Sequence, residues 1–305
     1  MKHHVIGLHH ITAIASDPKR NLDFYTQVLG LRFVKKSVNQ DDPGTYHLYY
    51  GDYEASPGTI LTFFPWAGLR RGRPGTGQAY ATAFSVPAGS LPFWQKHLTA
   101  LKVETAPVEK RFNDEVLPLL DPDGLRLELV ATSEVDSRKP TPSKVVPAEF
   151  AIRGFHSSTL AIADAKATTA VLVEQMGYRQ IARSGHRTRF AAGAGAPGTY
   201  VDLFTDPSLP NGLNGAGTIH HVAFRAPDDQ SELAARDVLT KAGLHVSPVI
   251  DRAYFKSIYY REPSGVLFEI ATDGPGFTID EPLASLGTAL GLPPRLEPYR
   301  SQIEA

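Results

Sequence analysis

Hydrophobic and polar positions along the chain repeat one order of elements, first seen in residues 10–64. Residues 10–17 are strand-like and end at Asp17-Pro18, a pair that favours the start of a helix. Apolar residues then recur at helical spacing as far as Gly30, which favours the end of a helix. Three strand-like runs follow, at residues 31–34, 46–50 and 59–64. The pattern therefore predicts a module of one strand, one helix and three further strands, written βαβββ.

The same order of elements returns three times. The second copy combines a strand over residues 79–86, a helix that Ser90 caps and a closing hairpin over 119–129. The third and fourth copies have helices over 164–177 and about 229–243, and closing strands over 200–205 and 265–270. These copies predict an α+β fold of four βαβββ modules in two paired-module domains with cupped mixed β-sheets.

The repeats and the loops between them predict boundaries along the chain. Residues 1–132 would hold two N-terminal modules, and residues 151–273 two C-terminal modules. Residues 133–150 are rich in Pro, Ser and charge, which is typical of a linker. Residues 274–305 form a Pro-rich C-terminal tail, with one short helix expected near 283–290.

Composition excludes several classes of function. The chain has 305 residues, 42% of them hydrophobic and 21% charged, which is ordinary for a soluble globular protein. A net charge of −1 gives no indication of nucleic acid or membrane as a partner. The absence of cysteine excludes disulfides and thiolate metal sites, and no membrane span or signal peptide is expected. We therefore expect a cytoplasmic protein, and homo-oligomerisation stays open.

Aligning the modules on their capping aspartates brings two histidines to one repeat position. Counting back seven residues from each cap reaches His10, Ser157 and His221, and the match in the second module lies near Thr82. The closing strands carry the carboxylates Glu128, Asp202 and Glu269, whereas the closing strand of the first module, residues 59–64, carries none. The second and third modules thus lack histidine at this position and predict a metal-free copy.

Pairing the first module with the fourth would line one cup with His10, His221 and Glu269. A single histidine on a strand is more commonly a packed or surface residue, but here two of them share one repeat position. Two histidines and one carboxylate with open positions are typical of non-haem Fe(II) oxygenases, and a ligand set without thiolate also suits Mn(II) or Zn(II). The sequence therefore predicts a divalent metal site.

Turn chemistry places one tyrosine beside this site. Residues 262–265, Glu-Pro-Ser-Gly, fit a type I turn followed by a left-handed glycine, which makes a three-residue hairpin loop with a bulge. That loop puts Tyr259 directly opposite Glu269, on the same face of the sheet. A two-residue loop would place Tyr260 there instead, and an aromatic residue that only fills the barrel interior is the plainer interpretation.

These motifs resemble the vicinal oxygen chelate superfamily, and within it the para-hydroquinone ring-cleaving dioxygenases, over essentially the whole chain. The resemblance rests on Gly-Leu-His9-His10-Ile-Thr, on Thr-Ile-His220-His221-Val-Ala-Phe, on residues 252–269 and on the tail motifs between 273 and 294. It implies His10, His221 and Glu269 as ligands of Fe(II) or, as an alternative, Mn(II). It also implies His9, Arg252 and Tyr259 as catalytic residues around the metal.

Without that resemblance, His9 and Arg252 would be interpreted differently. Strand alternation sends His9 and His220 to the face opposite the ligands unless a bulge intervenes, and His220 is interpreted as a packed or hydrogen-bonded residue. Arg252 would be a solvated loop residue. Other histidines, such as His47, His97, His186 and His245, are isolated and interpreted as ordinary. The GxGxxG match at 193–198 precedes a strand and contains Pro197, so a loop is expected there.

The expected function is ring cleavage of a hydroquinone- or catechol-like aromatic by an extradiol-type dioxygenase that uses O2 and a divalent metal. Tyr259, Phe255 and Phe277 are expected to form walls for a flat phenolic ligand. One alternative is a glyoxalase-type isomerase or lyase, but such relatives usually carry an extra carboxylate ligand, which residues 59–64 do not supply. Another is a non-catalytic binder of aromatic ligands, against which the intact ligand set argues.

Overall fold

The computed structural model describes residues 4–304, so the outer ends of the predicted boundaries at 1 and 305 lie outside the described residues. The first two modules lie before the linker. Module one consists of β1 (Leu8–Ala15), α1 (Pro18–Asp23) continued by a π-helical turn (Phe24–Val28), β2 (Arg32–Val38), β3 (Tyr46–Gly51) and β4 (Ile60–Pro65). Module two consists of β5 (Gln78–Pro87), α2 (Leu91–Ala100), β6 (Glu109–Arg111), β7 (Asp114–Leu120) and β8 (Arg126–Thr132).

Two further modules and the tail follow the linker. Module three consists of β9 (Gly154–Ala161), α3 (Ala165–Ala170) continued by a π-helical turn (Val171–Gln175), β10 (Arg179–Ser184), β11 (Arg187–Ala191) and β12 (Tyr200–Phe204). Module four consists of β13 (Ile219–Ala226), α4 (Asp229–Lys241), β14 (Ile250–Asp251), β15 (Phe255–Arg261) and β16 (Leu267–Pro275). The tail holds 3-10 turns at Phe277–Ile279, Leu283–Ser285 and Glu297–Tyr299, and ends with α5 (Arg300–Glu304).

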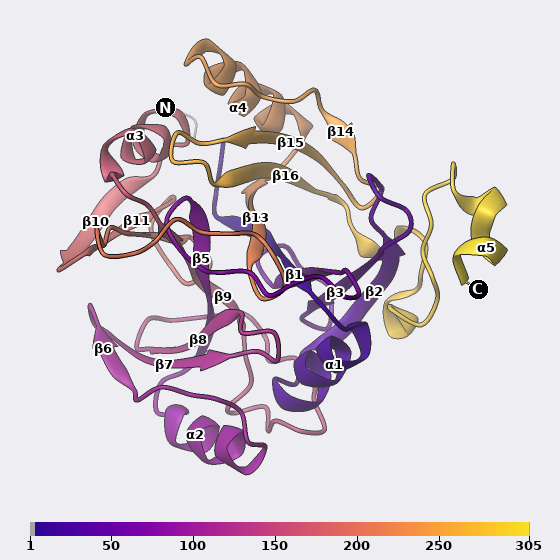
Figure 1. The fold of residues 1–305 in the computed structure, drawn as a ribbon, viewed down its shortest axis with the longest axis horizontal. Coiled ribbons are helices and arrows are strands. Elements are labelled where there is room, and N and C mark those ends of the chain that lie inside the picture. The colour runs from indigo at the N-terminus through magenta and orange to yellow at the C-terminus, as the bar shows by residue number, and fades with distance from the viewer. Residues whose placement is uncertain (1–3, 305) are drawn as a thin grey trace.

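The modules pair in two curled, mixed sheets of eight strands each, with helices on their outer faces (Figure 1). Modules four and one share the order β14-β15-β16-β13-β1-β4-β3-β2, and modules three and two share the order β10-β11-β12-β9-β5-β8-β7-β6. The central strands of each sheet run antiparallel, β1 against β13 and β5 against β9. The predicted fold class is confirmed. The division into domains at the linker stays a prediction, and strand pairing joins modules across that linker.

Aspartates begin three of the module helices, as expected. The side chains of Asp17, Asp164 and Asp228 accept hydrogen bonds from backbone N–H groups in the first turns of α1, α3 and α4. Such caps satisfy amides that have no partner inside the helix. Ser90 is the N-cap residue of α2 as expected, but its side chain makes no capping hydrogen bond. Leu91 follows it, with Pro92 in the first turn, and Pro has no N–H group to cap.

The hydrophobic core lies between the sheets and the helices that cover them. Phe224 and Phe268, on neighbouring strands of module four, are fully buried with their ring centroids 4.7 Å apart. On α2, Trp94 and Leu98 are fully buried, and the Trp94 indole N–H donates to Phe150 O. Each such side chain stabilises the fold by about 1.5–3 kcal/mol through burial. Packing of this kind is found in both halves of the molecule.

The tail is fixed to module one by a buried lysine. Lys35, fully buried on β2, bonds to Asp280 and Glu281 of the tail and lies 5.0 Å from the ring centroid of Tyr254.

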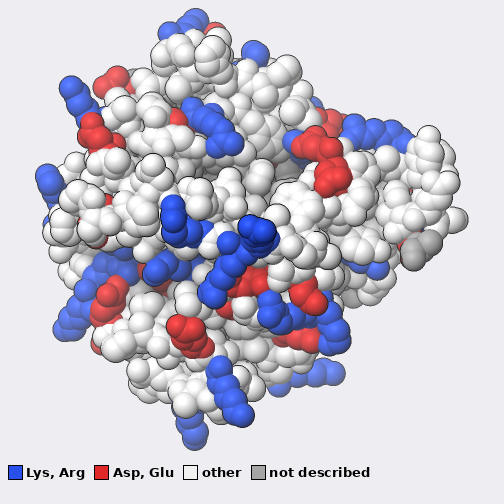
Figure 2. Space-filling model, viewed as in Figure 1, with Lys and Arg blue, Asp and Glu red and all other residues white. Residues whose placement is uncertain are grey.

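On the face shown in Figure 2, basic and acidic side chains are interspersed. Within residues 4–304, no helix combines the length and apolar character needed to span a membrane.

Candidate metal centre

Two β-bulges place pairs of histidines at the centre of the first sheet. On β1, Leu8 pairs with Phe224 and His10 with Ala223, so His9 is an extra residue. On β13, His220 is the extra residue, because Thr12 and Ala13 pair with His221 and Ile219. A bulge breaks the alternation of side chains along a strand. Both His9 and His220 therefore lie at a bulge, so strand alternation does not send either side chain to the face opposite the ligands.

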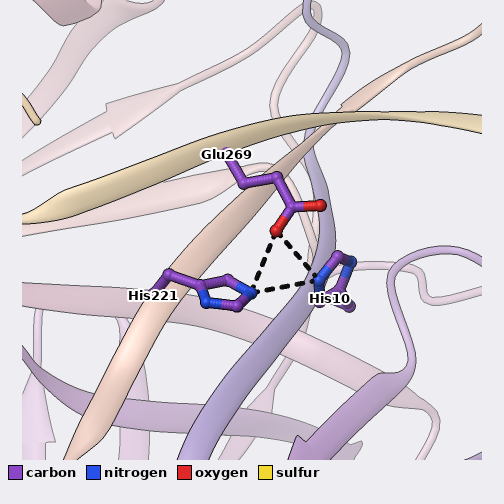
Figure 3. A group of neighbouring side chains, drawn as sticks. All are labelled: His10, His221 and Glu269. Atoms are coloured by element: carbon purple, nitrogen blue, oxygen red, sulfur yellow. Dashed lines mark hydrogen bonds and ion pairs between the residues drawn. The ribbon is translucent and has the colours of Figure 1, made fainter. Parts of the chain in front are cut away.

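His10, His221 and Glu269 converge on one buried point, as Figure 3 shows. Glu269 Oε2 lies 2.9 Å from His221 Nε2 and 3.3 Å from His10 Nε2, and the two nitrogens are 3.4 Å apart. Ligand atoms about 2.1 Å from a shared cation, at angles of about 90–109°, would be about 3.0–3.4 Å from one another. The three residues therefore fit a divalent metal ion.

The direction of the hydrogen bonds behind His10 supports this fit. The carbonyl oxygen of Thr272 can only accept, so His9 Nε2, 3.1 Å away, is the donor. Because burial and the neighbouring His10 lower the pKa of His9 to about 3, its ring is neutral and Nδ1 is an acceptor. His10 Nδ1, 2.9 Å away, must then carry the proton and donate it. His10 Nε2 is left with its lone pair directed at Glu269, where a cation would relieve the repulsion.

His220 repeats this arrangement behind the second ligand. Its Nδ1 lies 2.8 Å from Nδ1 of His221. Burial, together with His221, lowers the pKa of His220 to about 3, so this ring is also neutral. His9 is fully enclosed behind His10, whereas His220 lines the cavity beside the ligands. The sequence predicted a packed or hydrogen-bonded His220 but not its position in the cavity wall. The repeated His-His pair was the signal that could have indicated that position.

The carboxylate of Glu269 is held in place from the other side. Ser257 Oγ donates to Glu269 Oε1, while Oε2, which faces both imidazoles, accepts no hydrogen bond among the described residues. One oxygen of the carboxylate is therefore held by Ser257, and the other is available to a metal.

The hairpin β15–β16 has the predicted register. Tyr259 pairs with Glu269, Gly265 has φ +98°, and the N–H of Gly265 donates to Glu262 O. Arg252 Nε donates to the Tyr259 hydroxyl at 3.0 Å, and its other nitrogens contact Asp41 at 3.1 and 3.2 Å. Burial, together with the charge of Glu269, raises the pKa of Tyr259 well above its usual value, so the phenol keeps its proton.

Module one supplies the opposite wall without a carboxylate. Thr62 pairs with Thr12 on β1, just as Glu269 pairs with Ala223 on β13, so Thr62 occupies the position equivalent to Glu269. His47 Nε2 lies 2.8 Å from Thr62 Oγ1, and His47 Nδ1 lies 2.6 Å from the Tyr49 hydroxyl. His47, interpreted as ordinary from the sequence, therefore lies in this wall.

Beside these groups lies a cavity of about 380 Å³. Its lining includes all three candidate ligands together with Tyr259, Arg252, His220, His47, Tyr49, Phe64, Trp66 and Phe255. The expectation that Phe277 forms a wall is wrong. Phe277 stacks on Tyr254 with ring centroids 4.8 Å apart and contacts Tyr49 and Phe255 from behind, because the tail packs on the outside of these rings.

The second sheet fills the equivalent place with arginines. Asp202 accepts from Arg189 Nε at 2.8 Å and from Nη2 at 3.1 Å, and Glu128 accepts from Arg111 at 2.6 Å. Both carboxylates are buried, so their charges are compensated by guanidinium groups. The bulged strand β5 places Ala81, one residue from the expected Thr82, at the position of the ligand histidines.

Comparison with known proteins agrees with the fold. The family model described as Glyoxalase/Bleomycin resistance protein/Dioxygenase superfamily matches residues 7–270. This chain belongs to that superfamily. Among superfamily structures, that of a proposed dioxygenase from Bacillus subtilis superposes with a TM-score of 0.93 at 44% identity, covering 98% of this chain and 96% of the other. Glyoxalase I from Zea mays superposes with a TM-score of 0.65 at 13% identity, covering 88% and 92%, which shows a shared fold.

Superfamily members that are similar in sequence carry names of ring-cleaving enzymes. MhqO of Bacillus subtilis, named as a proposed ring-cleaving dioxygenase, is 45% identical over 98% of this chain and 95% of its own length. Chlorohydroquinone/hydroquinone 1,2-dioxygenase of Sphingobium indicum is 34% identical over 98% of this chain and 95% of its own length. The likeness therefore extends over both sheets and the tail.

Proposed function

We propose that the protein is a metal-dependent, extradiol-type ring-cleaving dioxygenase that acts on hydroquinone- or catechol-like aromatics. The observation that carries the proposal is the convergence of His10 Nε2, His221 Nε2 and an otherwise unbonded Glu269 oxygen at a cavity with aromatic walls. The names of the ring-cleaving relatives support the same class of reaction. The donor set suits Fe(II) foremost and Mn(II) as an alternative.

In this proposal the metal would be held by His10, His221 and Glu269 and would supply a Lewis acid and a path for electrons between substrate and O2. His9 and His220 fix the rings of the two ligand histidines through their Nδ1 atoms. Ser257 fixes the second oxygen of Glu269, so that the carboxylate presents one oxygen to the ion.

Tyr259 and Arg252 act on the substrate side. Because Arg252 Nε donates to the Tyr259 hydroxyl oxygen, the phenolic proton is free to be donated to an oxygen atom of the substrate. Asp41 holds the guanidinium of Arg252 in the orientation that this contact needs. The positive charge of Arg252, at the cavity wall, stabilises negative charge that develops on the ring oxygen.

Phe255 supplies a flat apolar surface next to the metal ligands. Its ring centroid lies 4.9 Å from that of His10 and 5.1 Å from that of His9. Aromatic ligands gain from such surfaces through stacking and apolar contact. Among residues 4–304, Arg252 is the only lysine or arginine that lines the cavity, so the walls suit a neutral phenol better than a multiply charged substrate.

The test is oxygen consumption by iron-loaded protein when hydroquinone is added, with catechol as a second substrate. We expect about one O2 consumed per aromatic ring and an ultraviolet-absorbing, ring-opened acid. The matched control is Glu269→Gln, which keeps the shape of the side chain and should lose both bound metal and activity. Conversion of a hemithioacetal without oxygen uptake would replace the dioxygenase with an isomerase.

A further inference from the structure

The wall that module one contributes mirrors the wall that module four contributes. Tyr49 pairs with Thr62, as Tyr259 pairs with Glu269. His47 bonds to Thr62 from two residues before Tyr49, as Ser257 bonds to Glu269 from two residues before Tyr259. A chain of neutral groups thus occupies the place where the fourth module carries a charged carboxylate.

The neutral groups form one continuous line of hydrogen bonds. The Tyr49 hydroxyl lies 2.6 Å from His47 Nδ1, and His47 Nε2 lies 2.8 Å from Thr62 Oγ1. Thr62 Oγ1 lies 2.7 Å from Thr12 Oγ1, on the strand that carries His10. Tyr49 and His47 line the cavity, whereas Thr12 and Thr62 are fully buried behind them. The line therefore has one end at the cavity and the other in the sheet.

This line can run in two directions without any change of charge. Burial, together with His10 and His221, lowers the pKa of His47 well below its usual value, so its ring has one donor and one acceptor nitrogen. In one direction Tyr49 donates to His47, and its oxygen can accept from a ligand. In the other, His47 donates to Tyr49, and the Tyr49 O–H needs an acceptor. In the part of the chain that the structure describes, His47 is the only hydrogen-bond partner of the Tyr49 hydroxyl.

We propose that Tyr49, supported by His47, Thr62 and Thr12, binds the second oxygen of the aromatic substrate, the one that does not bind at the metal ligands. This inference rests on the proposed function and adds a specificity residue to it. Because the hydrogen-bond line reverses, Tyr49 accepts from that oxygen while it is a hydroxyl and donates to it when it has carbonyl character. His47, Thr62 and Thr12 are positioning residues, since they act through Tyr49.

The surroundings of Tyr49 favour recognition over simple filling of space. A residue that only fills space needs no polar group at the cavity, yet here two consecutive inward-facing positions of β3 are polar. The His47 ring lies against Phe64, with centroids 4.4 Å apart, and Tyr49 is supported from behind by Phe277 at 5.3 Å. These contacts hold the hydroxyl in one place on an apolar wall, where a single hydrogen bond discriminates well between ligands.

Anaerobic binding of two probes, hydroquinone and phenol, to the metal-loaded protein tests the proposal by calorimetry or fluorescence quenching. Phenol has the same ring and one hydroxyl but lacks the second oxygen. One hydrogen bond contributes about 0.5–1.5 kcal/mol, so Tyr49→Phe should lower the preference for hydroquinone by about 2–12-fold. Thr62→Val, which keeps the shape but interrupts the line, should lower the same preference by a smaller factor.

Tyr50→Phe is the matched control, because Tyr50 is the next residue on β3, is fully buried, and donates to Asn21 Oδ1 at 2.8 Å. It should leave the hydroquinone preference unchanged even if it lowers stability. An unchanged preference in Tyr49→Phe overturns the role of Tyr49 while leaving the dioxygenase intact if oxygen uptake persists. Failure of wild-type protein to bind either probe overturns both proposals, and binding without oxygen uptake overturns the dioxygenase alone.

Discussion

Exchanging one carboxylate for an amide in each sheet should separate two effects, because only the exchange in the first sheet should remove stabilisation by metal. Glu269→Gln removes the charged ligand from His10 and His221, whereas Asp202→Asn removes one of the two carboxylates that bond to Arg189. Both side chains are fully buried, and each substitution keeps the size of the side chain. The pair therefore separates the loss of a metal ligand from the loss of a buried ion pair.

The expected magnitudes follow from the two environments. A ligand that binds only the folded state stabilises it by about 4 kcal/mol at a free concentration of about 1,000 times Kd. With an unfolding entropy of about 2.1 cal/mol/K per residue over 305 residues, 4 kcal/mol corresponds to about 6 °C in Tm. Arg189 keeps a second carboxylate, Asp114, at 2.8 Å, so Asp202→Asn should cost about 3 kcal/mol, at the lower end for a broken buried pair.

Thermal unfolding with a chelator and with excess Mn(II) measures both effects. Wild-type protein and Asp202→Asn should show the same metal-dependent rise in Tm, with the variant about 5 °C lower throughout. Glu269→Gln should show almost no rise, and metal analysis should find it empty after gel filtration. A full metal-dependent rise in Glu269→Gln, or its loss in Asp202→Asn, would refute the assignment of the site to the first sheet.

Three further substitutions test other parts of the argument. Tyr259→Phe should keep its metal but lower turnover by about 10²–10⁴-fold. Tyr260→Phe is the control and should change turnover little, because the Tyr260 hydroxyl donates to a methionine sulfur on the other face. Equal kinetics for the two variants would exclude the proton role of Tyr259. Gly265→Val should destabilise the hairpin by at least about 1–2 kcal/mol, because φ is +98°, and should weaken metal binding; unchanged urea unfolding would contradict the bulged turn. Burial, together with Asp229, raises the pKa of Glu232 from 4.5 to about 7, so the folded state holds the proton more tightly and stability falls as pH rises from about 4.5 to 7. Glu232→Gln should therefore gain about 1–3 kcal/mol over wild type at pH 8 and little at pH 4, and equal gains at both pH values in urea unfolding would contradict this.

Local patterns predicted the modules and one critical register. The aspartate caps gave the helix starts, because capping depends on a few consecutive residues. The turn at Glu262–Gly265 gave the pairing of Tyr259 with Glu269, because loop length determines hairpin register. The roles of His10, His221 and Glu269 as ligands stay predictions, although the structure brings them together as expected.

Features that depend on contacts between distant segments were not predictable in the same way. His47 looked isolated because its partner Thr62 lies on the next strand and its cavity is formed with module four. Phe277 was placed in the wall from its aromatic character, but Lys35 anchors the tail on the outer side of that wall. The bulges at His9 and His220 depend on pairing between strands more than 200 positions apart, where no turn sets the register.

The two bulges also make the site sensitive to the length of its strands. A regular strand presents one side chain to a given face about every 7 Å, so adjacent residues do not work together there. The extra residues His9 and His220 let each central strand place a ligand and the group that orients it next to each other. Deletion of His9 or of His220 would restore regular alternation and remove the group that orients the neighbouring ligand. Deletion of either residue should therefore weaken metal binding at least as much as alanine at the same position, because it removes the bulge together with the supporting ring.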